Sequence, residues 1–413
     1  MSVLINFICC LVPIASVRRK IRKYLKTKYI RYSNKKIAMN KRLLDKPLII
    51  WFDHSLGGGT DIYSLQQFTE VCNEYVVLRI QYYAIYKSFK IYFPNNRKTK
   101  DYWIDNIHDL ENLLNELPIK HIVINDLVGY NNSLDILDLI TKIKHKNTTI
   151  KVSFKCHDFQ AICPNFTLVN CEGQFCNLKY KYGCEKCWKK IRLGNNDIEN
   201  NILRSGAIDV ASWRMAFDKF FTNIVDEVVV FSEFTKNIFE RMYPILKTKI
   251  IIVPHSVKKY SHITIPKHDS INIACLGNIS YNKGAQIIRE MCSYIKNSTK
   301  YNNVNMYVIG NIYDSIVEKP ENLIITGEYK QENLPHIISK LKIDCIFIPS
   351  ICPETFSYTT SEAMSMGLPV VCFNLGAPAE RISKYEQGLV LQEINSVKAL
   401  KEIIKFVQQL HKK

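Results

Sequence analysis

The chain has 413 residues, 47% of them hydrophobic, and a formal net charge of +18. This length is too great for one ordinary core and fits two domains of about 150–200 residues, and the apolar content is that of a globular protein. Thirteen Lys or Arg and a single acid, Asp45, lie between residues 18 and 46. The rest of the chain is therefore only mildly basic, which argues against a folded nucleic-acid-binding face.

The amino terminus is an apolar run followed by a basic one. Residues 3–17 are short for a membrane span, which needs about 20 residues, and Pro13 interrupts them. A signal peptide carries its charges before the apolar run, whereas here they follow it. We therefore interpret residues 1–46 as an extension that binds an anionic membrane surface. A disordered extension, a nucleic-acid tail and acylation of Cys9 or Cys10 remain open.

Residues 47–255 are predicted to form a first α/β domain. A strand at 47–52 leads through Gly57-Gly58-Gly59 into a helix from about Asp61, and glycines at such a turn let the backbone approach a ligand. The full dinucleotide fingerprint is absent, which argues against NAD. Further strands are expected at 121–125, 150–156, 225–231 and 250–253, and helices at 134–144, 197–223 and 233–243.

His157 and Asp158 follow the strand at 150–156. Ligands bind at the carboxyl ends of strands in α/β sheets, so this pair is a candidate site. A single His at a strand end is, however, most often structural.

Five of the fourteen cysteines lie within residues 163–187. The spacing Cys184-x2-Cys187 is common among metal ligands, and a long loop without secondary structure needs something to fix it. We predict a structural Zn²⁺ ion bound by Cys163, Cys176, Cys184 and Cys187, with Cys171 spare. Reduced thiols or disulfides are the alternatives. Cysteines that occur singly in apolar strands are read as core residues, and the chain as a whole indicates a reducing cytoplasm.

Residues 256–395 are predicted to form a second α/β domain after a polar linker. Strands are expected at 271–276, 304–309 and 323–325, a loop at 373–380, and a basic amphipathic helix at 396–413. Lys283 lies beside the start of a helix, where it can reach a phosphate, although an ordinary surface lysine would have the same context.

The most specific stretch of the sequence contains Glu354 and Glu362. Apolar strands at 343–349 and 370–373 flank it, so the segment between them should form the helix of a βαβ unit. The start of that helix offers backbone N–H groups to an anion such as phosphate. Glu354 in the loop and Glu362 in the first turns of the helix can accept hydrogen bonds from the hydroxyls of a sugar nucleotide. Taken singly, each acid also fits a structural role, because the dipole favours an early Glu and a loop Glu is often solvated.

This Glu-x7-Glu stretch, with Pro-Glu-Thr-Phe-Ser at its start and Gly-Leu-Pro-Val at its end, resembles the donor-site signature of retaining glycosyltransferases of family 4. Other segments agree in the family's order: Gly57-Gly58-Gly59-Thr60, His157-Asp158, Val230-Phe231-Ser232-Glu233-Phe234, Val253-Pro254-His255-Ser256 and Lys283-Gly284. The resemblance implies an α/β fold of the GT-B type, two Rossmann-like domains facing a cleft. The first, 47–255, would bind the acceptor, the second, 256–395, the nucleotide sugar, and the helix at 396–413 would cross back.

The resemblance also implies roles for individual residues. His157 would contact the donor sugar near its anomeric centre, and Asp158 would orient it or bind the acceptor. The family usually has an Arg where this chain has Asn278, so Lys283 is left as the main cation for the diphosphate. The candidate catalytic residues are His157, Asp158, Lys283 and Glu354. The candidate donor-binding residues are Gly58, Gly59, Asn278, Lys283, Glu354, Phe356, Ser357, Tyr358, Thr359 and Glu362.

We therefore expect a retaining hexosyltransferase that uses a nucleotide-diphospho-sugar. The resemblance favours a growing, lipid-linked surface glycan of the lipopolysaccharide or capsule type as the acceptor, at the cytoplasmic face of the inner membrane. No catalytic cofactor is expected, and neither carboxylate need act as a nucleophile, as it would in a glycosidase. A sugar-nucleotide epimerase of the same fold and a non-catalytic scaffold of a polysaccharide assembly complex are the alternatives.

Overall fold

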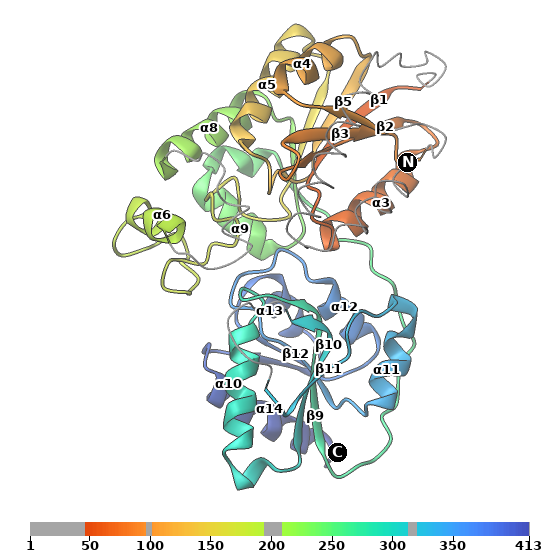
Figure 1. Cartoon of the computed structure of the whole chain (residues 1–413), viewed down its shortest axis with the longest axis vertical. Helices are drawn as coiled ribbons and strands as arrows, with labels where there is room; N and C mark the ends of the chain where they lie inside the picture. The colour runs from red at the N-terminus through yellow and green to blue at the C-terminus, as the bar shows by residue number, and fades with distance from the viewer. Residues whose placement is uncertain (1–45, 96–100, 194–208, 313–319, 413) are drawn as a thin grey trace, which may run out of the picture. The chain divides into compact units, whose positions relative to one another are not determined.

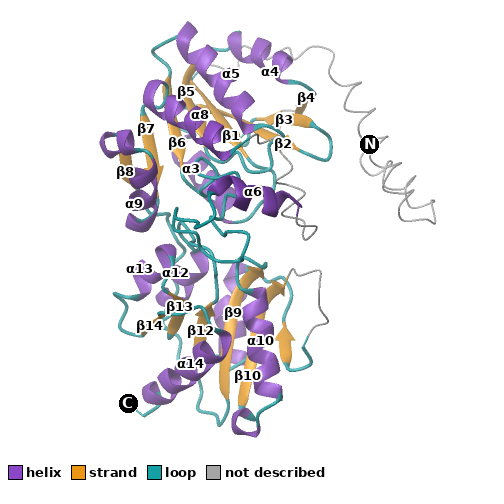
Figure 2. Ribbon diagram, turned by 90° about the vertical axis from the view of Figure 1, so that its left-hand side faces the viewer, coloured by secondary structure: helices purple, strands orange, loops and turns teal. Residues whose placement is uncertain are grey.

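The structure is a computed structural model that describes residues 46–95, 101–193, 209–312 and 320–412. Two β-sheets with their helices organise these residues (Figure 1; Figure 2 colours the same elements by type). By their contacts the described residues fall into two compact units, 46–155 with 209–228, and 156–193 with 229–412. The predicted extension at 1–46 lies outside the described residues except for Lys46.

The first sheet has eight strands in the order β4-β3-β2-β1-β5-β6-β7-β8. β1 runs parallel to β2 and β5, whereas β3 is antiparallel to β2 and β4. The strands are β1 (Leu48–Asp53), β2 (Val76–Tyr83), β3 (Ser88–Tyr92), β4 (Tyr102–Ile104), β5 (Ile119–Ile124), β6 (Lys151–Lys155), β7 (Glu227–Val230) and β8 (Ile250–Ile252). The helices in this part of the sequence are α3 (Gly59–Val71), α4 (Ile107–Asn115), α5 (Ser133–Lys146), α6 (Cys184–Leu193), α8 (Val210–Asn223) and α9 (Glu233–Met242), with a 3-10 turn η2 (Pro244–Thr248).

The second sheet has six strands in the order β11-β10-β9-β12-β13-β14, and all its pairs are parallel. Counted from its first strand, this order is 3-2-1-4-5-6, that of a doubly wound nucleotide-binding sheet. The strands are β9 (Ile271–Ile279), β10 (Val304–Ile312), β11 (Leu323–Ile325), β12 (Cys345–Ile348), β13 (Val370–Phe373) and β14 (Gly388–Leu391). The helices are α10 (Ala285–Lys296), α11 (Leu334–Lys340), α12 (Tyr358–Ser365), α13 (Gly376–Ile382) and α14 (Ser396–Leu410), with 3-10 turns η3 (Thr299–Tyr301) and η4 (Gln331–Asn333).

An apolar core lies on each face of the second sheet. One core contains side chains of α10 and α14, and the other contains side chains of α11, α12 and α13. Figure 1 shows α10 and α11 on opposite sides of the sheet. The near-continuous apolar strands of the sequence are explained by this arrangement, because a parallel strand is covered on both faces.

Two segments differ from the sequence-based expectation. Residues 373–380 were expected to form a loop but contain the start of α13, because Pro378 lies in the first helical turn, where its missing N–H costs no hydrogen bond. The strand β2 was not predicted, since Arg79 and Gln81 interrupt its apolar pattern. Both side chains are nevertheless buried.

Candidate functional site

The second sheet reverses its strand order between β9 and β12, and ligands bind outside the carboxyl ends of the two strands at such a reversal. The loop after β9 carries Lys283 and the loop after β12 carries Glu354. The Lys283 Nζ and Glu354 Oε2 atoms lie 3.9 Å apart. The lysine is half-exposed and the carboxylate mostly buried, with Ser350 donating its hydroxyl to Oε1. The structure thus brings two of the predicted catalytic residues together at the expected place.

Glycines allow the two loops to approach closely. Gly284 has φ +85°, and a Cβ there would lie 2.2 Å from the carbonyl oxygen of Pro349. A Cβ on Gly277 would lie 3.6 Å from Thr359 Cγ2, so the end of β9 lies beside the start of α12. Asn278, the next residue, is exposed at this strand end. The loop bearing Lys283 is therefore packed directly against the loop and helix that follow β12.

The amino terminus of α12 has no side-chain cap. Ser357 occupies the capping position with φ 75° and ψ 95°, and its hydroxyl accepts a hydrogen bond of 2.9 Å from Thr360 Oγ1 instead of capping a backbone N–H. Uncapped N–H groups in a first helical turn, here that of Tyr358 and Thr359, favour an anion. The helix start that follows Glu354 is therefore uncapped, as an anion site requires, and phosphate binding there stays a prediction.

Arg381 of α13 holds the loop that precedes α12, a role that the sequence did not reveal. Its guanidinium donates to the carbonyl oxygens of Phe356 and Ser357, the latter at 3.0 Å, and to the Ser361 hydroxyl. The guanidinium also lies 4.5 Å from the centre of the Phe356 ring. Burial lowers the pKa of Arg381 to about 10, so it remains charged at neutral pH. The available sequence signal was that Arg381 is the only Arg in the loop and helix that follow β13.

Glu362 lies in the second turn of α12 and is buried. It accepts a hydrogen bond from Gln331 Nε2, and burial raises its pKa while Gln331 and Lys258 oppose that rise. Burial and the Glu362 charge raise the pKa of Tyr260 to about 12. Tyr260 donates its hydroxyl to the Gln331 carbonyl at 2.9 Å. Glu362 is therefore held by Gln331, which Tyr260 holds in turn. The sequence did not indicate either of these two partners.

His157 follows β6, as predicted, and packs among aromatic rings. Its ring centre lies 4.5 Å from Phe231 and 5.3 Å from His255, and the His255 ring stacks on Phe356 at 4.4 Å. The Thr355 hydroxyl donates to the His157 carbonyl at 2.8 Å. These contacts connect His157 with the loop that bears Glu354. Burial and the Arg381 charge lower the pKa of His255 to about 3, so that imidazole is neutral at physiological pH.

Asp158 makes a local turn, since one carboxylate oxygen accepts a hydrogen bond of 2.6 Å from the Gln160 backbone N–H. This bond fixes the direction of the carboxylate relative to the backbone. The predicted role of Asp158 in orienting His157 or binding an acceptor remains a prediction.

The glycine-rich turn of the first sheet lies at the carboxyl end of β1. Gly58 has φ +84° and caps α3, and a Cβ there would meet no atom within 4 Å, so the backbone is open to an approaching group. Gly59 is the first residue of α3. Beneath the turn Arg79 bonds Asp53 at 2.5 Å and Asp61 at 2.6 Å. This buried ion-pair network, which the sequence did not reveal, fixes the turn on the sheet.

Cys187, one of the predicted zinc ligands, lies beside Cys171, the cysteine that the prediction left spare. The backbone N–H of Cys171 donates to Cys187 Sγ at 3.3 Å. Burial and the neighbouring thiols of Cys171 and Cys176 raise the pKa of Cys187 to about 12. Within the described residues, no three His, Cys, Asp or Glu side chains already stand as a group that could hold a metal ion.

Residues 257–413 match the family described as Glycosyl transferases group 1. The matched range contains the whole second sheet, with Lys283, Glu354 and the start of α12. No curated protein matches the chain.

Three solved structures each match 88% of this chain. HepE of Anabaena in complex with UDP-glucose is 11% identical, with a TM-score of 0.53 over 88% of this chain and 91% of that one. Sucrose-phosphate synthase of Thermosynechococcus elongatus is 12% identical, with a TM-score of 0.54 over 88% and 91%. The lipopolysaccharide outer core galactosyltransferase WaaB is 11% identical, with a TM-score of 0.53 over 88% and 90%. The chain therefore has the α/β fold of GT-B proteins, as predicted.

No helix in the described ranges is both long enough and apolar enough to cross a bilayer.

Proposed function

We propose that the chain is a retaining glycosyltransferase that transfers a hexose or deoxyhexose from a nucleoside-diphospho-sugar to a growing, lipid-linked surface glycan. The observation that carries the proposal is the group at the strand-order reversal: Lys283, Glu354 and the uncapped start of α12. The group 1 domain at 257–413 and the UDP-glucose complex of HepE support a sugar nucleotide as the donor.

In this proposal the donor diphosphate binds between Lys283 and the first turn of α12. The pair of Lys283 and Glu354 is loose and half-exposed, so its own contribution to stability is at most about 1 kcal/mol. Lys283 can therefore turn from Glu354 to a diphosphate with little loss. Glu354 is then released to accept hydrogen bonds from the sugar hydroxyls, and Glu362 would accept those of the ribose.

The same groups would stabilise the transition state. As the bond between the anomeric carbon and the diphosphate oxygen breaks, negative charge grows on the diphosphate, and Lys283, turned from Glu354, would stabilise that charge together with the α12 dipole. The acceptor hydroxyl attacks the anomeric carbon from the same face, and its proton passes to the departing phosphate oxygen. The products are a glycoside with the donor's anomeric configuration and a nucleoside diphosphate. His157 would lie near the anomeric carbon, with Asp158 beside it.

The first experiment is a donor screen with the purified full-length chain. Binding of UDP-, GDP-, dTDP- and ADP-sugars is measured by calorimetry, and transfer is measured with membrane extracts that contain lipid-linked glycans. One donor class should bind, and NMR of the product should show the donor's anomeric configuration. Inversion at that carbon would exclude the retaining mechanism, and conversion of the sugar nucleotide without an acceptor would favour an epimerase.

Substitutions then test the residues. Lys283→Ala should weaken donor binding by about 10- to 100-fold, since a hydrogen bond to a charged group is worth about 1.5–3 kcal/mol. Lys296→Ala is the matched control, because it removes an exposed ion pair with Glu321 at the other end of α10. Glu354→Gln should lower transfer in cells and in vitro. Equal donor affinity in the two lysine variants, or unchanged glycan synthesis with Glu354→Gln, would remove the basis of the proposal and favour a scaffold.

A further inference from the structure

The cysteine-rich segment is built with almost no apolar core. Between residues 170 and 191 the only buried side chain is that of Trp188. The backbone is also strained there, since the non-glycine residues Asn177 and Leu178 have φ 44° and 62°. Non-glycine residues in this region cost about 1–3 kcal/mol each and persist only when other interactions fix them. The segment therefore requires a source of stability other than hydrophobic burial.

Four cysteines lie where two local structures meet. Cys171 lies in the turn of a small hairpin and Cys176 directly follows it; the hairpin is closed by the bridge between Val169 and Phe175 and by the 2.7 Å bond from the Asn170 N–H to the Gln174 carbonyl. Cys184 and Cys187 lie three residues apart in the first turn of α6, so their side chains share one face of the helix. The 3.3 Å bond from the Cys171 N–H to Cys187 Sγ joins the hairpin to the helix.

We propose that Cys171, Cys176, Cys184 and Cys187 bind one structural Zn²⁺ ion. A hairpin pair and a helix pair supply four thiolates, the number that a closed tetrahedral zinc site requires. The hydrogen bond between Cys171 and Cys187 is the reason that Cys171 replaces Cys163 in the set expected from sequence. The backbone of Cys163 belongs to the preceding turn, where its N–H bonds the Phe159 carbonyl at 3.0 Å.

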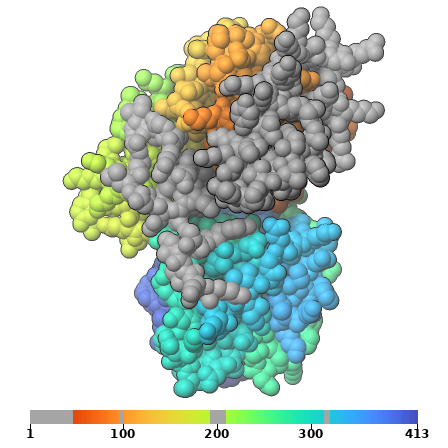
Figure 3. Space-filling view, in the orientation of Figure 1, coloured from red at the N-terminus to blue at the C-terminus, as the bar shows by residue number. Residues whose placement is uncertain are grey.

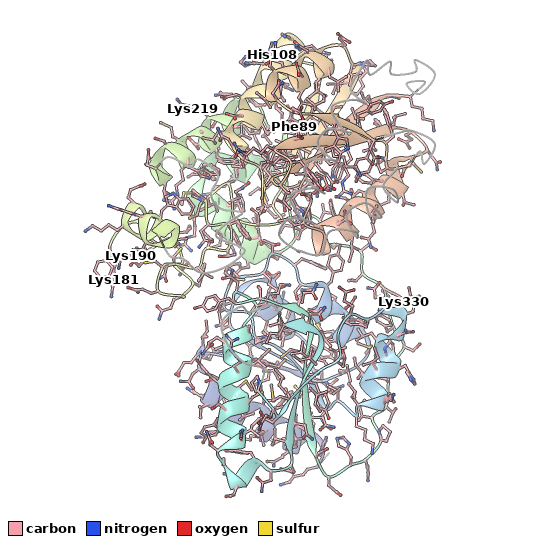
Figure 4. The ribbon with its side chains drawn as sticks, in the orientation of Figure 1. Phe89, His108, Lys181, Lys190, Lys219 and Lys330 are labelled. Carbon is pink, nitrogen blue, oxygen red and sulfur yellow. The ribbon has the colours of Figure 1, made fainter. Side chains whose placement is uncertain are left out.

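The surroundings fit such an ion electrostatically. Four thiolates and one Zn²⁺ carry a net charge of −2, and a backbone N–H donated to sulfur stabilises that charge. Five exposed lysines, against two exposed glutamates, surround the cysteines: Lys179, Lys181, Lys186, Lys189 and Lys190, against Glu172 and Glu185. Figure 4 labels Lys181 and Lys190 on this segment, and Figure 3 shows the segment, in yellow-green, at the surface.

Binding requires the thiols to turn inward. In the described residues they do not yet converge, and Cys171 Sγ lies 3.1 Å from the Tyr180 hydroxyl. An uncharged thiol adopts the rotamer that suits such a hydrogen bond, whereas a metal-bound thiolate points to the ion. In the proposed site the thiols would rotate about χ1 toward the ion, while the hydrogen bond from the Cys171 N–H to Cys187 Sγ keeps the hairpin and the helix together.

The ion would fix a turn that docks on α9. Arg241 of α9 donates to the side-chain oxygen of Asn177 at 3.0 Å and to its carbonyl at 3.2 Å. Asn177 lies directly after Cys176, in the strained part of the segment. Zinc bound at Cys176 would therefore hold the acceptor of this contact in place.

The test is metal content of the full-length chain purified under reducing conditions without chelators. Wild type and the control variants Cys163→Ser and Cys72→Ser should contain about one zinc per chain. Serine at position 171, 176, 184 or 187 should remove most of it. Zinc well below one equivalent in wild type overturns the proposal, and so does loss of zinc in Cys163→Ser with retention in Cys171→Ser.

A second measurement on wild type covers variants that fail to fold. A thiol-modifying mercurial added stepwise should release one zinc per four thiols modified, and Co²⁺ substitution should give the intense visible absorption of a tetrahedral thiolate site. An octahedral Co²⁺ spectrum, or a disulfide found between Cys171 and Cys187 in the freshly isolated chain, overturns the proposal.

Discussion

Replacing Arg381 with alanine is expected to damage both the stability of the second sheet's domain and its binding site. The guanidinium donates to two backbone carbonyls, those of Phe356 and Ser357, and to the Ser361 hydroxyl. These residues form the connection into α12. Alanine would leave the carbonyls without this donor and would no longer hold Ser357 at φ 75°.

The size of the effect follows from these contacts. A hydrogen bond from a charged donor contributes about 1.5–3 kcal/mol, and a buried group left unsatisfied costs about 1–3 kcal/mol. The three bonds share one side chain, so their contributions are not additive. Burial also lowers the pKa of the guanidinium to about 10, so keeping it charged costs free energy that offsets part of the gain from the bonds. We therefore expect the free energy of unfolding to fall by about 3 kcal/mol. Donor affinity should fall as well, because the same loop positions the uncapped N–H groups of α12.

Urea denaturation and donor calorimetry measure the two effects. Lys384→Ala is the control, since this exposed lysine lies one turn further along the chain and should change neither quantity. Arg381→Lys keeps the charge but not the planar fork, and should be intermediate. If Arg381→Ala stays within about 0.5 kcal/mol of wild type in stability, the size of a neutral surface substitution, the guanidinium does not hold the loop.

Three further predictions concern other parts of the chain. Gly284→Ala should destabilise the fold by more than about 2 kcal/mol in urea denaturation, because its Cβ would lie 2.2 Å from the Pro349 oxygen. Gly327 has a similar φ but open space around it, so Gly327→Ala should cost less. Equal losses of stability in the two variants would contradict the packing argument. Burial raises the pKa of Glu362, so its contribution to stability is present below its unfolded pKa and is lost as the pH rises through the folded value. Glu362→Gln without donor should therefore be more stable than wild type at pH 7, with the difference shrinking toward pH 4, and a constant difference across that range would refute this. Deletion of residues 1–30 should reduce sedimentation with anionic vesicles at moderate salt, and unchanged sedimentation would exclude the proposed membrane extension.

The parts of the fold that the sequence predicted are those set by local pattern. β11 has the bounds expected for it, and β13 does too, because short apolar runs between breaking residues have few other structures available. The meeting of Lys283 and Glu354 was also predictable, since each follows a strand and parallel strands bring their carboxyl ends to one edge.

The parts that were missed depend on contacts between distant residues. Arg79 is buried because Asp53 and Asp61 pair with it, and nothing in the local pattern of β2 announces those partners. Arg381 and the carbonyls that it binds are separated by more than twenty residues. In the sequence, a buried charged residue cannot be told from a surface residue until its partner is known. Arg79 and Arg381 were therefore not recognised as buried residues with a structural role.

The positions of the cations decide how the proposed site would handle a diphosphate. Asn278 stands, exposed, at the position where the resembled family usually has an Arg. Its amide side chain is neutral and supplies no charge. Arg381 is close to the loop, but its guanidinium is engaged with the carbonyls of Phe356 and Ser357 and would have to abandon them to reach a ligand. Lys283 has only a loose contact with Glu354 and can move at little cost. In the proposed site the two cations would therefore have separate roles: Arg381 fixes the connection into α12, and Lys283 would neutralise the phosphate together with the start of that helix.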